Sequence, residues 1–220
     1  MAQLVSGLTA ERVGGNLATV RERIAAAAER AGRDPQEVEL VAAVKYVPVA
    51  ELGALAEAGI EVVGENRAQD LEANIAAHAD AFTWDFIGHV QSRKVKQIAS
   101  RVRLIHSVST DSVLEQLRRH APPELRVLVE VNVAGEEGKG GIAPAELGAF
   151  CQRCPVPVAG LMTMPPLATE PEDSRRWFAA LRELAEEHGL EQLSMGTTQD
   201  YEIAVEEGAT LVRIGTELYR

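Results

Sequence analysis

The chain has 220 residues, of which 46% are apolar and 25% are charged, and this globular composition excludes a disordered or collagen-like chain. Its 22 basic and 33 acidic residues give a net charge of −11, which argues against binding to nucleic acid, because a phosphate backbone requires a basic surface. The length predicts one large domain or two small ones.

The first predicted element is an amphipathic helix over residues 9–31. Its apolar residues recur at helical spacing between arginines and glutamates, and Gly32 follows as a stop signal. The start of the chain lacks the basic and apolar regions of a signal peptide, and no apolar run approaches the roughly 18 residues of a membrane span. We therefore expect a cytoplasmic protein that does not enter a membrane.

Eight short apolar runs follow, rich in Val, Ile and Leu, as expected of parallel strands buried on both faces. They cover residues 38–44, 60–63, 84–88, 104–108, 126–133, 156–162, 192–195 and 210–214. Helices are predicted between them over residues 49–58, 67–78, 92–99, 111–120, 144–153, 172–188 and 199–207.

This alternation of strand and helix predicts a parallel sheet, either open and doubly wound or closed into a barrel. Eight strands favour closure, and no Gly-x-Gly-x-x-Gly follows the first strand, as a dinucleotide-binding fold would require. We predict an α/β fold, a (β/α)8 TIM barrel with an additional N-terminal helix. No linker or low-complexity tract divides the chain, so residues 1–220 are expected to form a single domain.

The carboxyl ends of the strands are the expected location of the site, as in other barrels of this kind. Lys45 directly follows the first apolar run and is the only one of the four lysines with such an apolar approach. Against the barrel interior its amine would lose hydration, its pKa would fall, and the neutral amine could form a Schiff base. A lysine that extends into water at a strand end would fit the same position equally well.

Two glycine turns follow the last two predicted strands. They contain Gly196, Thr197 and Thr198 after the seventh strand, and Gly215 and Thr216 after the eighth. Backbone amides and threonine hydroxyls in such turns suit a phosphate group. A helix-capping box formed by Thr197 and Asp200 would account for part of the same pattern and is compatible with phosphate binding.

A lysine amine opposite a phosphate site suits pyridoxal phosphate, which carries an aldehyde at one end and a phosphate at the other. Arg213, near the end of the eighth run, would then lie near the pyridine nitrogen. Its permanent charge would oppose protonation of that nitrogen and weaken the ring as an electron sink. The alternative for Arg213 is an ion pair with Glu65 or Asp200 inside the barrel.

Ordered sequence blocks over nearly the whole chain carry a family resemblance. They are residues 40–45, 64–67, 84–89, 91–92, 106–108, 131–133, 160–164, 193–196 and 213–216. In these blocks the chain resembles the pyridoxal-phosphate homeostasis proteins (the YggS/PROSC family), whose barrel is similar to the N-terminal domain of bacterial alanine racemase.

The resemblance implies that Lys45 carries the cofactor as an internal aldimine, that Asn66 lies near the ring, and that Arg213 approaches the ring nitrogen. It also implies which groups bind the phosphate: the Thr198 hydroxyl and the amides around Gly196, Gly215 and Thr216. The chain departs from the family at Val44 and Tyr46, where Ser and Thr are frequent, and at Thr197 and Thr198, where Met and Ser are common. Thr198 can replace a serine hydroxyl, whereas Thr197 changes the edge of the pocket.

The expected function is that of a carrier rather than an enzyme. A racemase of the similar fold needs a second domain that supplies a tyrosine, and this chain stops six residues after Ile214. We expect a monomeric protein that stores or delivers pyridoxal 5'-phosphate in vitamin B6 homeostasis, with PLP-dependent apoenzymes as candidate recipients.

Two enzymatic alternatives stay open: a weak PLP-dependent amino-acid racemase and a cofactor-free Schiff-base aldolase. His89 and His106 are the candidate acids for either reaction, although histidines at strand ends are equally often structural. Cys151 and Cys154 form an isolated Cys-x-x-Cys that lacks half the ligands of a tetrahedral zinc site, so no metal is expected.

Overall fold

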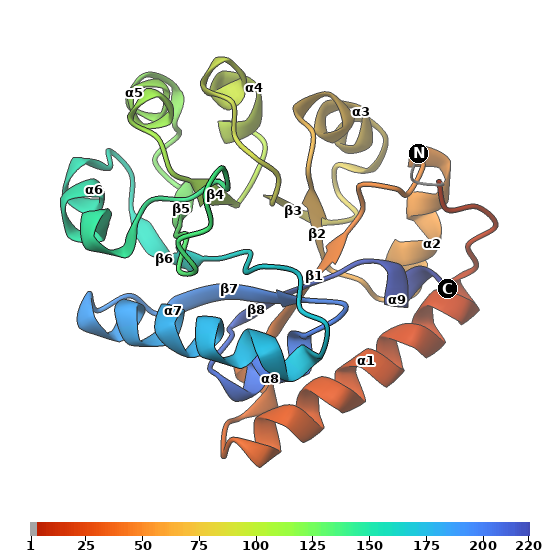
Figure 1. The fold of residues 1–220 in the computed structure, drawn as a ribbon. Coiled ribbons are helices and arrows are strands. Elements are labelled where there is room, and N and C mark those ends of the chain that lie inside the picture. Colours follow the sequence, from red (N-terminus) through yellow and green to blue (C-terminus); the bar gives the residue numbers. More distant parts are fainter. Residues whose placement is uncertain (1–3) are drawn as a thin grey trace.

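A computed structural model describes residues 4–220 as a closed barrel of eight parallel strands (Figure 1). Each strand pairs with the next along the chain, and β8 closes the barrel by pairing with β1. The strands are β1 Glu39–Ala43, β2 Val62–Glu65, β3 Thr83–Phe86, β4 Leu104–Val108, β5 Arg126–Glu130, β6 Val158–Met162, β7 Gln192–Thr197 and β8 Leu211–Ile214. The predicted (β/α)8 barrel is confirmed.

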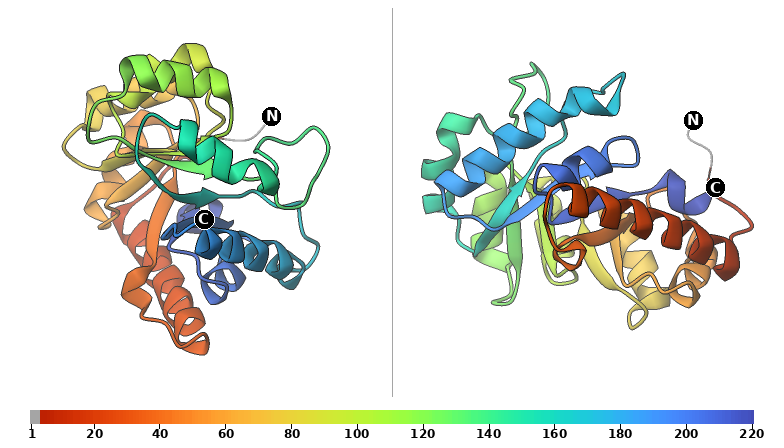
Figure 2. Two further views of the ribbon diagram at one scale, coloured as in Figure 1. Left: turned by 90° about the vertical axis from the view of Figure 1, so that its left-hand side faces the viewer. Right: turned by 90° about the horizontal axis from the view of Figure 1, so that it is seen from below.

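The helices surround the strands, as the two turned views of Figure 2 show. They are α1 Ala10–Arg30, α2 Leu52–Glu57, α3 Ala68–His78, α4 Val95–Ala99, α5 Asp111–His120, α6 Leu147–Arg153, α7 Arg175–Glu187, α8 Tyr201–Glu206 and α9 Thr216–Tyr219. Short 3-10 helices are η1 Pro35–Glu37, η2 Val49–Glu51, η3 Ser92–Lys94, η4 Pro144–Glu146 and η5 Pro171–Ser174. Within residues 4–220 no helix has both the length and the apolarity of a membrane span.

Helix α1 confirms the predicted N-terminal helix to within one residue at each end. Thr9 is its N-cap, and the Thr9 side chain accepts a hydrogen bond from the Arg12 amide. The buried face contains Val13, Leu17 and Val20, and the helix packs against α8, α9 and α2. Because α9 has only one turn, α1 covers the side of the barrel where a full eighth helix would otherwise lie (Figure 1).

The predicted strand ends differ from the observed ones where polar residues take part in pairing. Strand β2 begins and ends two residues later than predicted, because Gly64 and Glu65 pair with β3. Strand β7 extends to Thr197, which pairs with Arg213 of β8. Strand β5 ends at Glu130, three residues early, and Val131 makes only an isolated bridge to Ile142. Helix α9 is not predicted by the apolar pattern.

Gly160 permits β6 and β7 to approach each other closely. A Cβ atom at this position would lie 1.8 Å from the carbonyl oxygen of Gln192, the residue that Gly160 faces across the two strands. Backbone atoms cannot turn away as a flexible side chain would. We expect Gly160→Ala to lower the free energy of unfolding by at least about 2 kcal/mol, measured by urea denaturation.

Gly53→Ala is the matched control for this substitution. Gly53 lies in α2, and a Cβ atom there would meet no atom within 4 Å. Alanine removes backbone freedom from the unfolded chain, so Gly53→Ala should be neutral or stabilising by about 0.5 kcal/mol. Equal unfolding free energies for the two variants would contradict the strand packing described above.

Candidate functional site

A cavity of about 500 Å³ lies at the carboxyl ends of the strands, a volume in the range of small-molecule sites. Its polar lining consists of Lys45, Tyr46, Asn66, His89, Ser107, Glu130, Thr197, Thr198, Gln199, Arg213, Thr216 and Tyr219. Gly215 also lines it. The cavity therefore brings together seven of the eight residues that the sequence predicts to bind a cofactor, all except Gly196.

Lys45 lies in the turn that directly follows β1. Lys45 is exposed, so the expectation that the barrel interior removes water from its amine is wrong. The Nζ atom lies 5.0 Å from the centroid of the Tyr46 ring, and Lys45 is one of the residues that line the cavity. The Tyr46 carbonyl accepts a hydrogen bond of 2.9 Å from the Val5 amide, so the segment before α1 holds this turn.

Glu65 organises the turn that presents Asn66 to the cavity. Its Oε1 atom accepts hydrogen bonds from the amides of Asn66 (2.6 Å) and Arg67 (3.2 Å), and its Oε2 accepts one from Asn74 Nδ2 (3.0 Å). Burial raises the pKa of Glu65, and these three donors oppose the shift. Glu65 therefore stabilises the turn after β2 through these hydrogen bonds. The alternative of an ion pair between Glu65 and Arg213 is wrong.

Asn66 carries a buried hydrogen-bond acceptor that lacks a donor. Its Oδ1 atom has no hydrogen-bond partner within the described part of the chain, although Asn66 lines the cavity. Buried acceptors are normally paired, so a ligand donor would satisfy this one. Gly88 fixes the position of Asn66 from the β3 side, since a Cβ atom at Gly88 would lie 2.1 Å from the Asn66 carbonyl oxygen.

The two glycine turns after β7 and β8 are tied to each other. Thr198 Oγ1 accepts a hydrogen bond of 3.2 Å from the Gly215 amide. The amides of Thr198 and Thr216 donate no hydrogen bond to any residue that the structure describes. These two amides and the Thr198 hydroxyl are available to an anion in the cavity.

Helix α8 begins differently from the prediction. It starts at Tyr201 with Asp200 as N-cap, whereas the sequence predicts a start at residue 199 and a capping box led by Thr197. Asp200 Oδ1 accepts hydrogen bonds from the Thr197 amide (2.8 Å) and hydroxyl (3.2 Å), and the first of these is one half of the predicted capping box. The Asp200 carboxylate thus ties down the turn between β7 and α8, and it forms no ion pair with Arg213.

Gly196 supports this turn from behind rather than lining the cavity. Its φ angle is +87°, and a Cβ atom there would lie 2.5 Å from the Cβ of Ala204 and 2.9 Å from the Cα of Tyr201. The glycine lets the end of β7 pack directly on α8.

Arg213 is the buried cation of the site, with 6% of its surface exposed. Its Nη1 donates to Ser194 Oγ at 2.5 Å, and its Nη2 donates to the Thr163 carbonyl at 3.0 Å and to Met164 Sδ at 2.9 Å. Burial lowers the pKa of Arg213 to about 10, against the opposing charges of Asp200 and Glu130. The guanidinium therefore stays charged at neutral pH.

His106 does not line the cavity, which agrees with the structural alternative for this histidine rather than with a role as an acid. It is fully buried, and its Nε2 and Nδ1 atoms lie 3.2 Å from Asp85 Oδ2 and 2.8 Å from Ser194 Oγ. Burial lowers the pKa of His106, although Asp85 raises it. His89, in contrast, lines the cavity.

The depressed pKa of His106 makes stability depend on pH. At pH values above about 6.5, the imidazole is neutral in both the folded and unfolded states. As the pH falls below that value, the unfolded chain binds a proton that the folded protein excludes, so stability is lost toward acid. The charged groups around the ring are Asp85, Arg103 and Arg213.

We therefore expect wild type to lose up to about 1.4 kcal/mol more stability than His106→Asn between pH 7.5 and pH 5.5. Urea denaturation at the two pH values measures this difference. Identical pH dependence in the two proteins would mean that His106 binds a proton as readily in the folded protein as in the unfolded chain.

Glu130 and Tyr219 are among the cavity residues that the sequence reasoning misses. Glu130 is the last residue of β5 and lines the cavity. The prediction from sequence is limited to residues at predicted strand ends, and it misses Glu130 because the predicted strand continues to residue 133. Burial raises the pKa of Glu130, with His89 and Arg213 opposing. Tyr219 reaches the cavity from α9, where its hydroxyl donates to the Ala43 carbonyl at 3.2 Å. No apolar periodicity signals this short helix.

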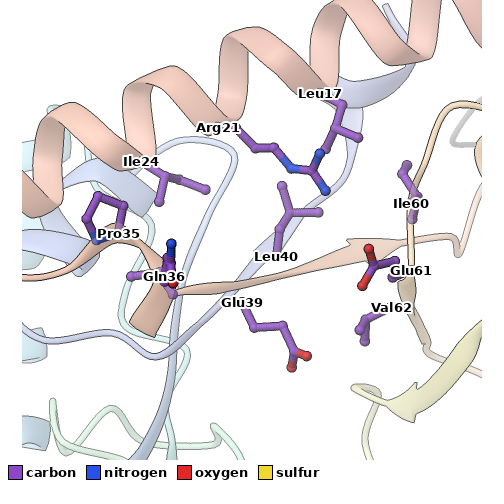
Figure 3. A pocket seen from close by; sticks show the side chains of 11 residues that line it. Leu17, Arg21, Ile24, Pro35, Gln36, Glu39, Leu40, Ile60, Glu61 and Val62 are labelled. Atoms are coloured by element: carbon purple, nitrogen blue, oxygen red, sulfur yellow. The ribbon is translucent and has the colours of Figure 1, made fainter.

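A second cavity, of about 440 Å³, lies at the opposite end of the barrel (Figure 3). Leu17, Arg21 and Ile24 of α1 face the start of β1 and the residues before β2 across it. It contains none of the predicted site residues. The carboxyl-end cavity is therefore the candidate site.

No protein-family model matches the chain. The chain is 42% identical to the pyridoxal phosphate homeostasis protein of Aquifex aeolicus (strain VF5), over 92% of this chain and 95% of that protein.

Two solved structures are similar at 30% sequence identity. An unknown protein from Bifidobacterium adolescentis has a TM-score of 0.87, over 99% of this chain and 98% of that one. PipY of Synechococcus elongatus PCC7942 with PLP bound has a TM-score of 0.77, over 94% of this chain and 100% of that one. With the identity to the Aquifex aeolicus protein, these matches show that the chain belongs to the pyridoxal phosphate homeostasis protein family.

Proposed function

We propose that this protein binds pyridoxal 5'-phosphate in the carboxyl-end cavity and holds it as a Schiff base on Lys45, to store or deliver it in vitamin B6 homeostasis. The observation that carries the proposal is the single cavity shared by Lys45, Asn66, Arg213 and the two glycine turns. The PLP-bound structure of PipY and the names of the relatives support it.

The donor set of the cavity fits this cofactor. Pyridoxal phosphate supplies an aldehyde, which condenses with a primary amine and releases water. Lys45 is the only lysine in the lining. The Thr198 hydroxyl and the amides of Thr198 and Thr216 suit the phosphate, and the unpaired Asn66 Oδ1 suits a donor on the ring.

Arg213 favours a carrier over an amino-acid enzyme. Its charged guanidinium near the ring nitrogen would oppose protonation of that nitrogen and limit the electron-withdrawing power of the ring. The relatives are named as homeostasis proteins. We infer that the protein works in the cytoplasm as a monomer and passes the cofactor to PLP-dependent apoenzymes.

The phosphate part of this proposal is tested with a ligand that lacks it. We expect pyridoxal phosphate to bind at least about 100-fold more tightly than pyridoxal, because several charge-assisted hydrogen bonds are lost without the phosphate. Titration followed by visible absorbance gives both affinities. Equal affinities would show that the glycine turns bind no phosphate.

A further inference from the structure

A chain of hydrogen bonds crosses the barrel interior to the candidate site. At its outer end Glu39 accepts two hydrogen bonds from Arg103 (3.0 and 2.7 Å), and Arg103 donates two more to Asp85 (3.1 and 2.8 Å). Asp85 contacts His106, His106 contacts Ser194, and Ser194 contacts Arg213, as described above. Glu39 also borders the cavity at the opposite end of the barrel (Figure 3).

The inner part of this series of hydrogen bonds is closed to water. Asp85, His106 and Ser194 are each 0% exposed, and Arg213 is 6% exposed. In contrast, the side chains of Arg103 and Glu39 are 39% and 40% exposed. Four buried polar groups inside the barrel carry a large desolvation cost, which mutual hydrogen bonding offsets.

With a neutral imidazole, the chemistry of the groups fixes the direction of every hydrogen bond. Arginine can only donate, so Ser194 Oγ accepts from Arg213, and the single Ser194 hydroxyl hydrogen is left for His106 Nδ1. His106 Nε2 then carries the ring hydrogen and donates to Asp85, which also accepts from Arg103. All four inner groups are satisfied with a neutral imidazole.

The same series of hydrogen bonds sets how the Arg213 guanidinium is oriented toward the cavity. Of the five N–H donors of a guanidinium, three are taken up by Ser194, the Thr163 carbonyl and Met164. Anchors on both terminal nitrogens fix the plane of the group and leave two donors. Arg213 lines the cavity, so those donors are the ones a ligand can use.

We propose that Ser194 and His106 are positioning residues, which act through Arg213 to hold its guanidinium against the pyridine ring nitrogen. The Asp85–Arg103 pair fixes His106 in the tautomer that this requires. This inference rests on the proposed binding of pyridoxal phosphate and deepens it.

The test is a double-mutant cycle of Ser194→Ala and Arg213→Met, with pyridoxal phosphate as the probe. Ser194→Ala should weaken binding about 10-fold in the wild-type background and less than about 2-fold in the Arg213→Met background. The pH midpoint of the Schiff-base absorbance should rise in both single variants, because a positive charge near the ring is loosened or removed.

Thr210→Val is the matched control, because the Thr210 hydroxyl accepts from the Leu193 amide at 2.8 Å, on the same strand pair. It should keep both the affinity and the pH midpoint, whatever its stability. His106→Asn keeps an acceptor for Ser194 and should keep the midpoint near that of wild type. His106→Leu should raise it, and it replaces Ser194→Ala if that variant does not fold.

Three results would overturn the inference. The first is an equal loss of affinity from Ser194→Ala in both backgrounds, and the second is an unchanged pH midpoint in Ser194→Ala and His106→Leu. The third is wild-type protein that gives no visible absorbance with pyridoxal phosphate, which would refute the proposed function as well. A wild-type absorbance together with either of the first two results would leave the proposed function intact.

Discussion

Lys45→Ala should abolish the visible absorbance that pyridoxal phosphate gives with the wild-type protein. Only a primary amine in the cavity can condense with the aldehyde, and Lys45 is the only lysine that lines it. Loss of the covalent bond should also weaken binding at least about 100-fold. Absorbance titration of the purified variant measures both effects.

Two controls show whether the loss of absorbance comes from the missing Lys45 amine. One tests the loss of positive charge, and the other tests the loss of a different lysine. Lys45→Arg keeps the positive charge but cannot form a Schiff base, so it should lose the absorbance as well. Lys139 bonds to the Pro165 carbonyl at 3.1 Å and to Glu136 at 2.7 Å, and Lys139→Ala should keep the absorbance. Full absorbance in Lys45→Ala would remove Lys45 from the account.

Gly196→Ala should disrupt the phosphate side of the site without changing any group that touches the ligand. The added Cβ atom would meet Ala204 at 2.5 Å and Tyr201 at 2.9 Å, in a backbone conformation with a φ of +87°. Left-handed strain and overpacking together should lower the free energy of unfolding by about 3 kcal/mol. The displaced turn carries Thr198, so the affinity for pyridoxal phosphate should fall at least about 10-fold.

Gly189→Ala isolates the contribution of the backbone conformation. Gly189 follows α7 with a φ of +64°, and a Cβ atom there would meet nothing within 4 Å. This variant should lose about 1 kcal/mol of stability and no affinity. Urea denaturation and absorbance titration compare the two variants, and equal effects on both properties would contradict the packing of Gly196 on α8.

The number and order of the strands follow from the sequence, because parallel strands buried on both faces need continuous apolar runs. The strand ends are predicted less well, since backbone pairing continues into polar residues such as Glu65 and Thr197. Helix α9 is missed because one turn is too short to show a periodic pattern.

The candidate site follows largely from topology. Residues at the carboxyl ends of barrel strands must meet at one end, and this rule alone brings Lys45, Asn66 and Arg213 to one cavity. The exposure of Lys45 depends on how its turn packs, and the partners of Arg213 depend on which side chains meet inside the barrel. Neither is encoded in local spacing, so Ser194 and His106 become partners of Arg213 only in the structure.

The identity of the reacting amine is tested most directly by borohydride reduction of the protein loaded with pyridoxal phosphate, followed by peptide mass analysis. The reduction turns a Schiff base into a stable pyridoxyl-lysine. We expect one adduct per chain, on the peptide that contains Lys45, and none without the cofactor. An adduct confined to Lys94, Lys96 or Lys139, or no adduct at all, would contradict the account, and the second result would favour a cofactor-free lysine enzyme.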